Sequence, residues 1–126
     1  MKALQIIECA YRGTLEEQDD TIIWLTHSMR DAGADLSLML CGAAVNYVLH
    51  GQDATGLQLG KWDQTRPPDI EGELARLRDK QVEIYVVRED MERRGIAHQP
   101  RLEGVHLIER AGIPALMEAH DRVWFW

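Results

Sequence analysis

Two cysteine side chains could carry nucleophilic chemistry in this 126-residue chain. Cys9 ends the apolar segment Leu4–Cys9, and Cys41 ends the apolar segment Leu36–Cys41. Both segments have the composition of β-strands, so in a parallel sheet their thiols would lie at the same edge. Such a pair suits sulfur transfer, in which one thiol accepts sulfur and the other resolves the product. We prefer Cys41 because the adjacent Gly42 permits close approach of a partner, although a free cysteine commonly packs as a small hydrophobic side chain.

Two arginines and one histidine are candidates for binding an anion near these thiols. Arg12 and Arg88 follow the first and third expected strands, and a guanidinium group can hold a persulfide or a sulfonate at that edge of the sheet. His98 follows a short helix in a loop, where it is placed to line a pocket. The alternative for each arginine is full solvation or an ion pair with a nearby glutamate.

The histidines and cysteines do not indicate a metal site. None of the five has the His-x-x-x-His spacing of a helical zinc site, and the two cysteines do not form a Cys-x-x-Cys pair. The residues after Cys41 also lack the glycine pattern of a phosphate-binding loop. We therefore predict no metal and no cofactor.

The charge and the apolar segments exclude several classes of partner. The formal net charge of -7 argues against binding to nucleic acid or to an anionic membrane surface, because both require clustered lysine and arginine. No apolar run approaches the ~20 residues that span a bilayer. The N-terminal segment becomes acidic too early for an export signal, and two cysteines without such a signal indicate free thiols in the cytoplasm.

The elements that must position these side chains alternate between strand and helix. Residues 1–126 are short enough for one domain and long enough for one core. The alternation predicts an α/β fold, a three-layer α/β/α sandwich with a mostly parallel five-stranded sheet. The five expected strands are Leu4–Cys9, Leu36–Cys41, Val82–Val87, Val105–Ile108 and Val123–Trp126.

Capping residues predict where the helices begin and end. Thr14 and Glu17 match a capping box at the start of a helix that Gly33 ends. Asp69 can cap a helix that runs to about Lys80. A helix is also expected over Ala43–His50. A short helix is expected to begin with Glu89 and Asp90 and to end with Arg93 and Arg94, which is the charge order that the helix dipole favours. Gly112 and Pro114 open a further helix.

Four segments in this order resemble the DsrE/DsrF-like superfamily, the small sulfur-relay proteins that include the DsrE, DsrF and DsrH subunits and the TusB, TusC and TusD subunits. The resemblance covers nearly the whole chain and implies the same α/β/α fold. The four segments are Ile6–Gly13, Asp31–Gly42, Ile84–Gly95 and Gly112–Trp126.

The resemblance also implies a specific position for a sulfur acceptor. Family members often carry a cysteine at the end of the strand before the short helix, where the helix N-terminus stabilises a thiolate or persulfide. In the register set by Arg93, Arg94 and Gly95, Val87 stands at that position and cannot accept sulfur. Subunits that lack this cysteine act as structural or docking partners. The resemblance therefore implies a docking subunit in cytoplasmic sulfur trafficking; the alternative is a sulfurtransferase that carries a persulfide on Cys41 or Cys9.

The family's assemblies imply a homo-oligomer, a trimer or a hexamer, with a sulfur-carrier protein as a further partner. Two segments have the composition of interface material. Gly51–Asp69 is long, irregular and rich in glycine, and Val123–Trp126 carries three aromatic rings.

Overall fold

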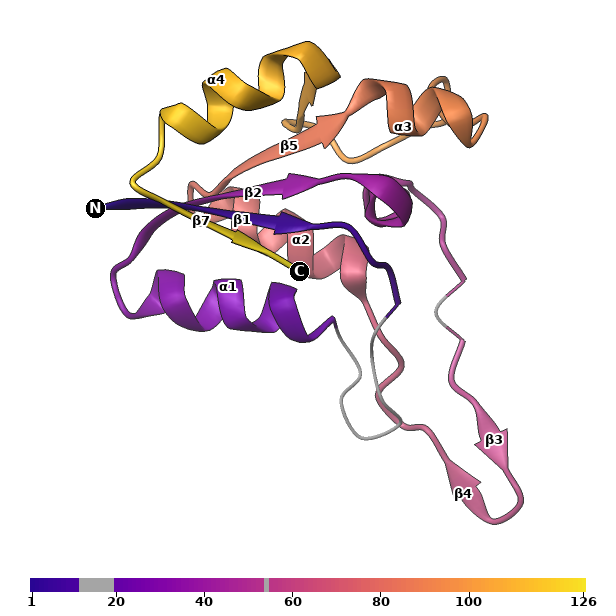
Figure 1. Cartoon of the computed structure of the whole chain (residues 1–126). Coiled ribbons are helices and arrows are strands. Elements are labelled where there is room, and N and C mark those ends of the chain that lie inside the picture. The colour runs from indigo at the N-terminus through magenta and orange to yellow at the C-terminus, as the bar shows by residue number, and fades with distance from the viewer. Residues whose placement is uncertain (12–19, 54) are drawn as a thin grey trace.

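A computed structural model describes residues 1–11, 20–53 and 55–126 as a five-stranded parallel sheet with helices on both faces (Figure 1). The strand order is β6-β5-β2-β1-β7, and each neighbouring pair in it is parallel. The expected α/β/α sandwich is thus confirmed, with strand boundaries shifted by one or two residues. The strands of the sheet are β1 (Lys2–Ile7), β2 (Asp35–Leu40), β5 (Glu83–Val87), β6 (His106–Ile108) and β7 (Arg122–Phe125).

The register brings the carboxyl ends of four strands to one edge. Ile7 at the end of β1 pairs with Leu40 at the end of β2, and Val87 of β5 pairs with Ile108 of β6. The last residue of each strand is therefore followed by a connection on the same side of the molecule. This edge is where parallel α/β folds usually place their ligands.

Helices α1 (Thr21–Asp31) and α2 (Ile70–Asp79) cover one face of the sheet, and α4 (Ile113–Glu118) covers the other (Figure 1). As predicted, Asp69 caps α2, because its side chain accepts the Gly72 N–H at 3.1 Å. The proposed capping box of Thr14 and Glu17 lies outside the described residues. The N-cap of α1 is instead Asp20, which accepts hydrogen bonds from two backbone N–H groups of the first turn.

The segment after β2 differs from its prediction in helix type. Residues Gly42–Val48 form a 3₁₀ helix, η1, where an α-helix over Ala43–His50 was expected. The tighter hydrogen-bond pattern is seen at both ends, in the Ala44 N–H to Cys41 carbonyl bond and the Leu49 N–H to Asn46 carbonyl bond. Leu49, the residue after the helix, is extended and forms a β-bridge with Arg101.

The remaining helices follow the carboxyl ends of β5 and β6. Helix α3 (Arg88–Arg93) starts directly after β5, as the order of acidic and basic residues predicts, and Gly95 beyond it has a positive φ of 67°. The short helix η2 (Arg110–Gly112) follows β6 and leads into α4, where Pro114 lies in the first turn. None of the helices in the described part of the chain is long and apolar enough to cross a membrane.

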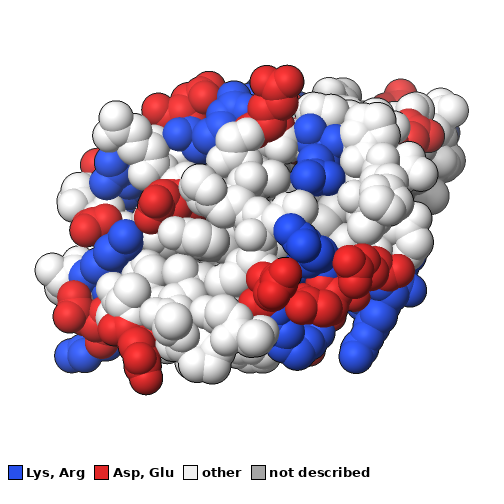
Figure 2. Space-filling view, turned by 90° about the horizontal axis from the view of Figure 1, so that it is seen from above, with Lys and Arg blue, Asp and Glu red and all other residues white. Residues whose placement is uncertain are grey.

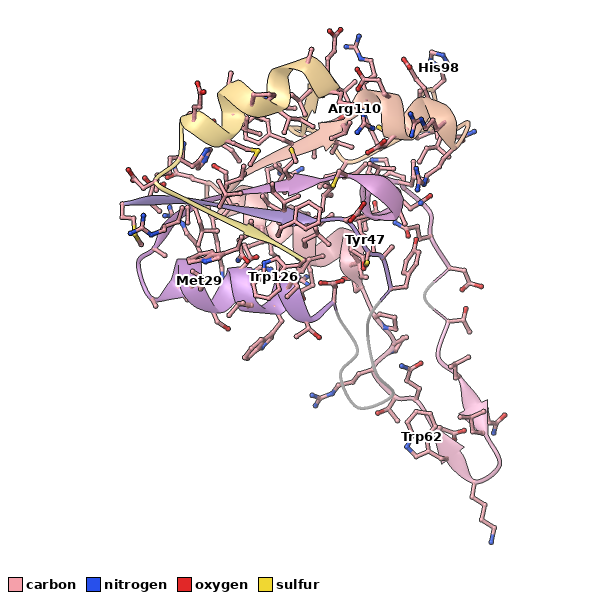
Figure 3. All side chains as sticks on the ribbon, in the orientation of Figure 1. Met29, Tyr47, Trp62, His98, Arg110 and Trp126 are labelled. Carbon is pink, nitrogen blue, oxygen red and sulfur yellow. The ribbon has the colours of Figure 1, made fainter. Side chains whose placement is uncertain are left out.

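The segment Gly51–Asp69 contains a short antiparallel hairpin that was not predicted. Strands β3 (Gln58–Leu59) and β4 (Trp62–Asp63) pair with each other and project away from the sheet as an arm (Figure 1). Trp62 lies on this arm, far from the body of the domain (Figure 3), and Leu57 and Leu59 are also exposed.

The aromatic C-terminal strand packs in part on its own domain. Trp124 lies against the core, and the indole N–H of Trp126 donates to the Gln5 side-chain carbonyl at 2.9 Å. The Gln5 amide in turn donates to the Thr26 hydroxyl at 2.9 Å, inside the layer between the sheet and α1. Phe125 is left exposed.

Candidate functional site at the carboxyl edge of the sheet

Cys41 lines a recess at this edge, between one face of the sheet and the helices α3 and α4. The recess has a volume of about 420 Å³. The backbone N–H of Cys41 donates to the Ile7 carbonyl at 3.0 Å, and its Sγ lies 3.7 Å from the same oxygen. The recess is lined by Ile6, Glu8, Met39, Cys41, Gly42, Asp90, Arg93, Arg94, Arg110, Ile113, Met117 and Phe125.

The carboxylate of Asp90 is the most buried charged group that lines this recess, with 5% of the residue exposed. Its Oδ2 accepts the backbone N–H of Gly42 at 2.8 Å, and its Oδ1 accepts Nη2 of Arg110 at 2.5 Å. A buried carboxylate is stable only with such hydrogen bonds and a paired charge. One side chain therefore joins the start of α3 to the end of β2 and to the connection after β6.

Glu89 makes a second link between the same connections. Both of its carboxylate oxygens accept the backbone N–H of Arg110, at 3.0 and 2.9 Å. This N–H begins η2, so it has no partner within that short helix. Glu89 and Asp90 thus direct their negative charge to backbone N–H groups and to one guanidinium of the same chain.

Gly42 is required at its position for two reasons. Its φ is +53°, and a Cβ there would lie 2.8 Å from Cγ and 3.1 Å from the carbonyl oxygen of Glu8. The close approach predicted for this glycine is made by Glu8 of the same chain rather than by a partner.

The surroundings of Cys41 disfavour its thiolate. Burial, with smaller contributions from the carboxylates of Glu8 and Asp90, raises the pKa of Cys41 to about 11, although Arg110 lowers it. Cys9 also raises this pKa, so the two cysteines are close enough to interact electrostatically, and both are free thiols. Cys9 is exposed and Cys41 half-buried. Their roles in sulfur chemistry stay predictions, and the environment gives no reason to prefer Cys41.

Val87 stands at the position where the resemblance expects an acceptor. It ends β5 and is the N-cap residue of α3. Its side chain is fully buried and packs with Leu4, Ile6 and Met39 in the apolar cluster under α4. An accessible nucleophile at this point would require that cluster to open.

The predicted anion-binding residues lie elsewhere. Arg88 and His98 line a separate recess of about 460 Å³ together with Arg101, so the structure brings two of the three candidates together but away from Cys41. Arg88 lies 3.4 Å from the carboxylate of Glu109, the exposed ion pair that was the alternative interpretation. Arg12 lies outside the described residues.

Among the described residues, three of the five histidines have a hydrogen-bond or ion-pair partner, and the ring of His106 packs against that of Tyr85. His27 and His50 pair with the carboxylates of Glu73 and Glu71, and buried His120 bonds to the hydroxyl of Ser37 at 3.1 Å. Among the residues that the structure describes, no group of three or more His, Cys, Asp or Glu side chains is placed to hold a metal ion.

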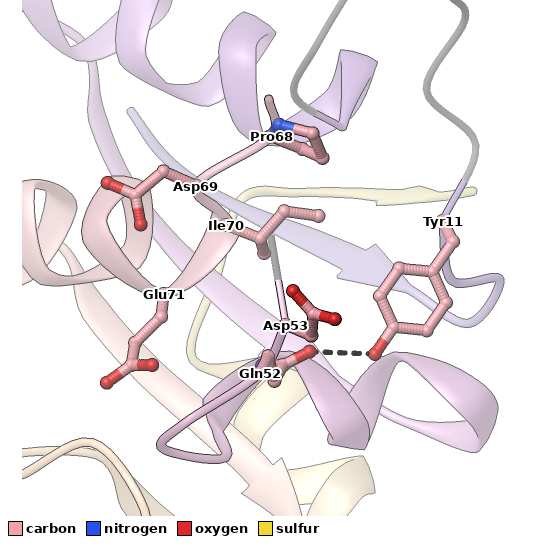
Figure 4. A pocket seen from close by; sticks show the side chains of 7 residues that line it. All are labelled: Tyr11, Gln52, Asp53, Pro68, Asp69, Ile70 and Glu71. Carbon is pink, nitrogen blue, oxygen red and sulfur yellow. Dashed lines mark hydrogen bonds between the residues drawn. The ribbon is translucent and has the colours of Figure 1, made fainter. Parts of the chain in front are cut away.

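A third recess lies near the other end of η1 (Figure 4). Its volume of about 130 Å³ is below that of ordinary small-molecule sites. The Tyr11 hydroxyl donates to the Gln52 side-chain carbonyl at 2.8 Å across its mouth. Asp53, Asp69 and Glu71 also line it, which makes it acidic.

Sequence reasoning missed Arg110 and the arginines at the end of α3 as residues of this edge. Arg93 and Arg94 were assigned only to the C-terminal charge of a helix. The signal for Arg110 was its position after an expected strand, the same reasoning that selected Arg12 and Arg88. Only the fold brings Arg110 to Asp90, twenty positions earlier in the chain.

Comparison with known proteins supports the fold. The sequence matches no protein-family model and no curated protein. Similar solved structures include the YchN protein from E. coli, with a TM-score of 0.68 and 22% identity over 100% of both chains. A protein of unknown function from Methanobacterium thermoautotrophicum, MTH1491, has a TM-score of 0.61 and 13% identity over 99% of this chain and 98% of its own. Both have the DsrE-like fold, which is thus the fold of this chain.

The raised pKa predicts the pH dependence of Cys41 alkylation. With Cys9 removed by Cys9→Ser, the rate with iodoacetamide should rise about tenfold per pH unit up to pH 10 or above, because only the thiolate reacts. At neutral pH the thiolate fraction should be about 100-fold below that of a thiol with the ordinary pKa of 9.0. Adding Glu8→Gln should move the plateau to lower pH. A plateau below pH 9 in the Cys9→Ser protein would contradict this account.

Proposed function

We propose that this chain is a DsrE-like protein of cytoplasmic sulfur trafficking that acts as a structural or docking subunit and does not itself accept sulfur. The observation that carries this proposal is the buried side chain of Val87 at the position where family members often carry the acceptor cysteine. The DsrE-like fold supports the family assignment, since it reproduces the strand, the short helix and the edge on which that acceptor would lie.

The electrostatics of the edge favour the same proposal. A sulfur acceptor needs an accessible thiolate, and a pKa of about 11 leaves only about one Cys41 thiol in ten thousand ionised at pH 7. The N-terminal turn of α3, which could stabilise a thiolate, contains Glu89 and Asp90 instead. Their charges are already matched by partners of the same chain.

The alternative function is a sulfurtransferase that carries a persulfide on Cys9 or Cys41. The exposure of Cys9 is the observation in its favour, because a sulfur donor can reach that thiol directly. In this function the thiolate of one cysteine attacks the inner sulfur of the persulfide on the other, which forms a Cys9–Cys41 disulfide and releases the outer sulfur as hydrosulfide.

Persulfide trapping separates the two functions. The purified protein is incubated with an inorganic polysulfide, alkylated and examined by intact mass spectrometry. We expect no alkylated persulfide on either cysteine at neutral pH. Val87→Cys combined with Leu116→Ala, which removes a side chain packed against the cluster that buries Val87, should form one if burial is what closes this position. A persulfide that forms on the wild type and disappears in Cys9→Ser or Cys41→Ser would establish the alternative.

We further propose that the chain assembles as a trimer or hexamer and docks a sulfur-carrier protein. The arm formed by β3 and β4 supports this proposal. It contains only two residue pairs, and an isolated two-stranded hairpin is marginally stable in water. Leu57, Leu59 and Trp62 are exposed on or beside it, and such a set of apolar side chains is typical of a surface that another subunit covers.

Solution mass tests the assembly. Light scattering at micromolar concentration should give a multiple of the 14.4 kDa chain mass. Leu59→Ser with Trp62→Ser should shift the mass toward that of one chain, because both side chains contribute apolar area to the interface. Lys61→Ser, on the same hairpin, is the matched control and should leave the mass unchanged. A wild-type mass near 14.4 kDa would rule out the oligomer.

A further inference from the structure

Helix α4 is packed less closely than the other α-helices. Its sequence, Ile-Pro-Ala-Leu-Met-Glu, is largely apolar, yet of the α-helices in the described part of the chain it alone has no buried residue. Ile113 and Leu116 only partly contact the apolar cluster on the sheet, and Met117 is 39% exposed. The rest of the chain therefore covers only part of the apolar surface of α4.

The space beside α4 is the recess that contains Cys41. Its apolar wall comes from two layers: Ile6 and Met39 from the sheet, and Ile113 and Met117 from α4. Phe125 of β7 lies at the same recess and is 62% exposed. A volume of about 420 Å³ is within the range of sites for small organic ligands.

The recess also has a charged wall, in which two arginines lack an ion-pair partner among the described residues. Arg110 is paired with the carboxylate of Asp90. Arg94 donates to the backbone carbonyl oxygen of Asp90 at 3.3 Å and has no ion-pair partner among the described residues. The side chain of Arg93 makes no hydrogen bond or ion pair with any described residue. Figure 2 shows this side of the molecule, where uncharged surface is bordered by basic and acidic side chains.

We propose that this recess binds an organic anion with an apolar body, such as a carboxylate with a medium-length hydrocarbon chain. The head group is held by Arg93 and Arg94, because guanidinium groups form charge-assisted hydrogen bonds with carboxylates. The body lies against Met117 and Phe125 and completes the packing under α4.

The position of the head group follows from the charges on the opposite wall. Glu8 and Asp90 both disfavour a negative charge at Cys41, so an anion is repelled from that end of the recess. Asp90 is neutralised by its own partners, whereas the side chain of Glu8 makes no hydrogen bond or ion pair with any described residue. Glu8 therefore weakens the binding of an anion, and its removal should strengthen it. The site does not depend on whether the chain carries sulfur.

Calorimetric titration with octanoate tests the proposal on the wild-type protein. We expect saturable binding of octanoate, with octanol and octylamine binding at least tenfold more weakly, because neither supplies an anionic head. Arg93→Gln with Arg94→Gln should weaken octanoate binding at least fivefold, and Glu8→Gln should strengthen it about twofold or more. Arg122→Gln removes an exposed arginine of β7 outside the recess and should have no effect.

Three results would overturn the proposal. The first is no octanoate binding to the wild type at millimolar concentration. The second is equal binding of octanoate and octanol, which would show a merely apolar surface. The third is binding that Arg93→Gln with Arg94→Gln leaves unchanged while thermal unfolding shows the variant to be folded. If octanoate does not bind and Met117→Asp dissociates an oligomer, a second copy of the chain occupies the recess instead.

Discussion

The recess that contains Cys41 depends on one buried carboxylate, that of Asp90. Asp90 lies in the first turn of α3 and connects this helix to two other segments. Its carboxylate accepts the Gly42 N–H at the start of η1 and a guanidinium N–H of Arg110 at the start of η2. Burying a carboxylate is unfavourable by several kcal/mol unless hydrogen bonds and a counter-charge compensate it. Both are present here, so the three connections are held in one arrangement, and the recess beside them has a defined shape.

This arrangement explains why the edge has no thiol with a lowered pKa, although the end of β5 and the N-terminus of α3 could position one. The N–H groups at the starts of η1 and η2, which could stabilise an external anion, bind Asp90 and Glu89 instead. The same carboxylate of Asp90, with Glu8 and with burial, keeps the Cys41 thiol protonated at neutral pH. The position that would carry an acceptor is filled by Val87, which contributes to the apolar cluster under α4. These features support our proposal that the chain docks a partner and does not itself accept sulfur.

Much of the fold could be predicted because it depends on local patterns. The apolar runs of β1 and β2 are buried on both faces, so their composition identifies them without alternation. The caps of α2 and the charge order of α3 also act within a few residues. The hairpin arm was not predicted, because two residue pairs give too short a pattern for any periodicity to detect.

The site was less accessible to prediction, because its interactions join distant parts of the chain. Cys9 and Cys41 were correctly placed at one edge, since that follows from strand order, but the burial and the carboxylates around Cys41 do not. Arg88 and His98 line one recess, which was not predicted, and it lies on the other side of α3 from the side chains that line the Cys41 recess. The bond between Asp90 and Arg110 requires β5 and β6 to be neighbours, which the sequence does not state.

Hydrogen exchange at the backbone amide of Gly42 tests the central claim most directly. If Asp90 holds this edge together, the Gly42 amide should be strongly protected in the wild type and should exchange about 10- to 100-fold faster in Asp90→Ala, which corresponds to the loss of one charge-assisted hydrogen bond. The neighbouring Cys41 amide, which bonds to the Ile7 carbonyl within the sheet, is the internal control and should change little. A Gly42 amide that exchanges at the same rate in both proteins would contradict the account.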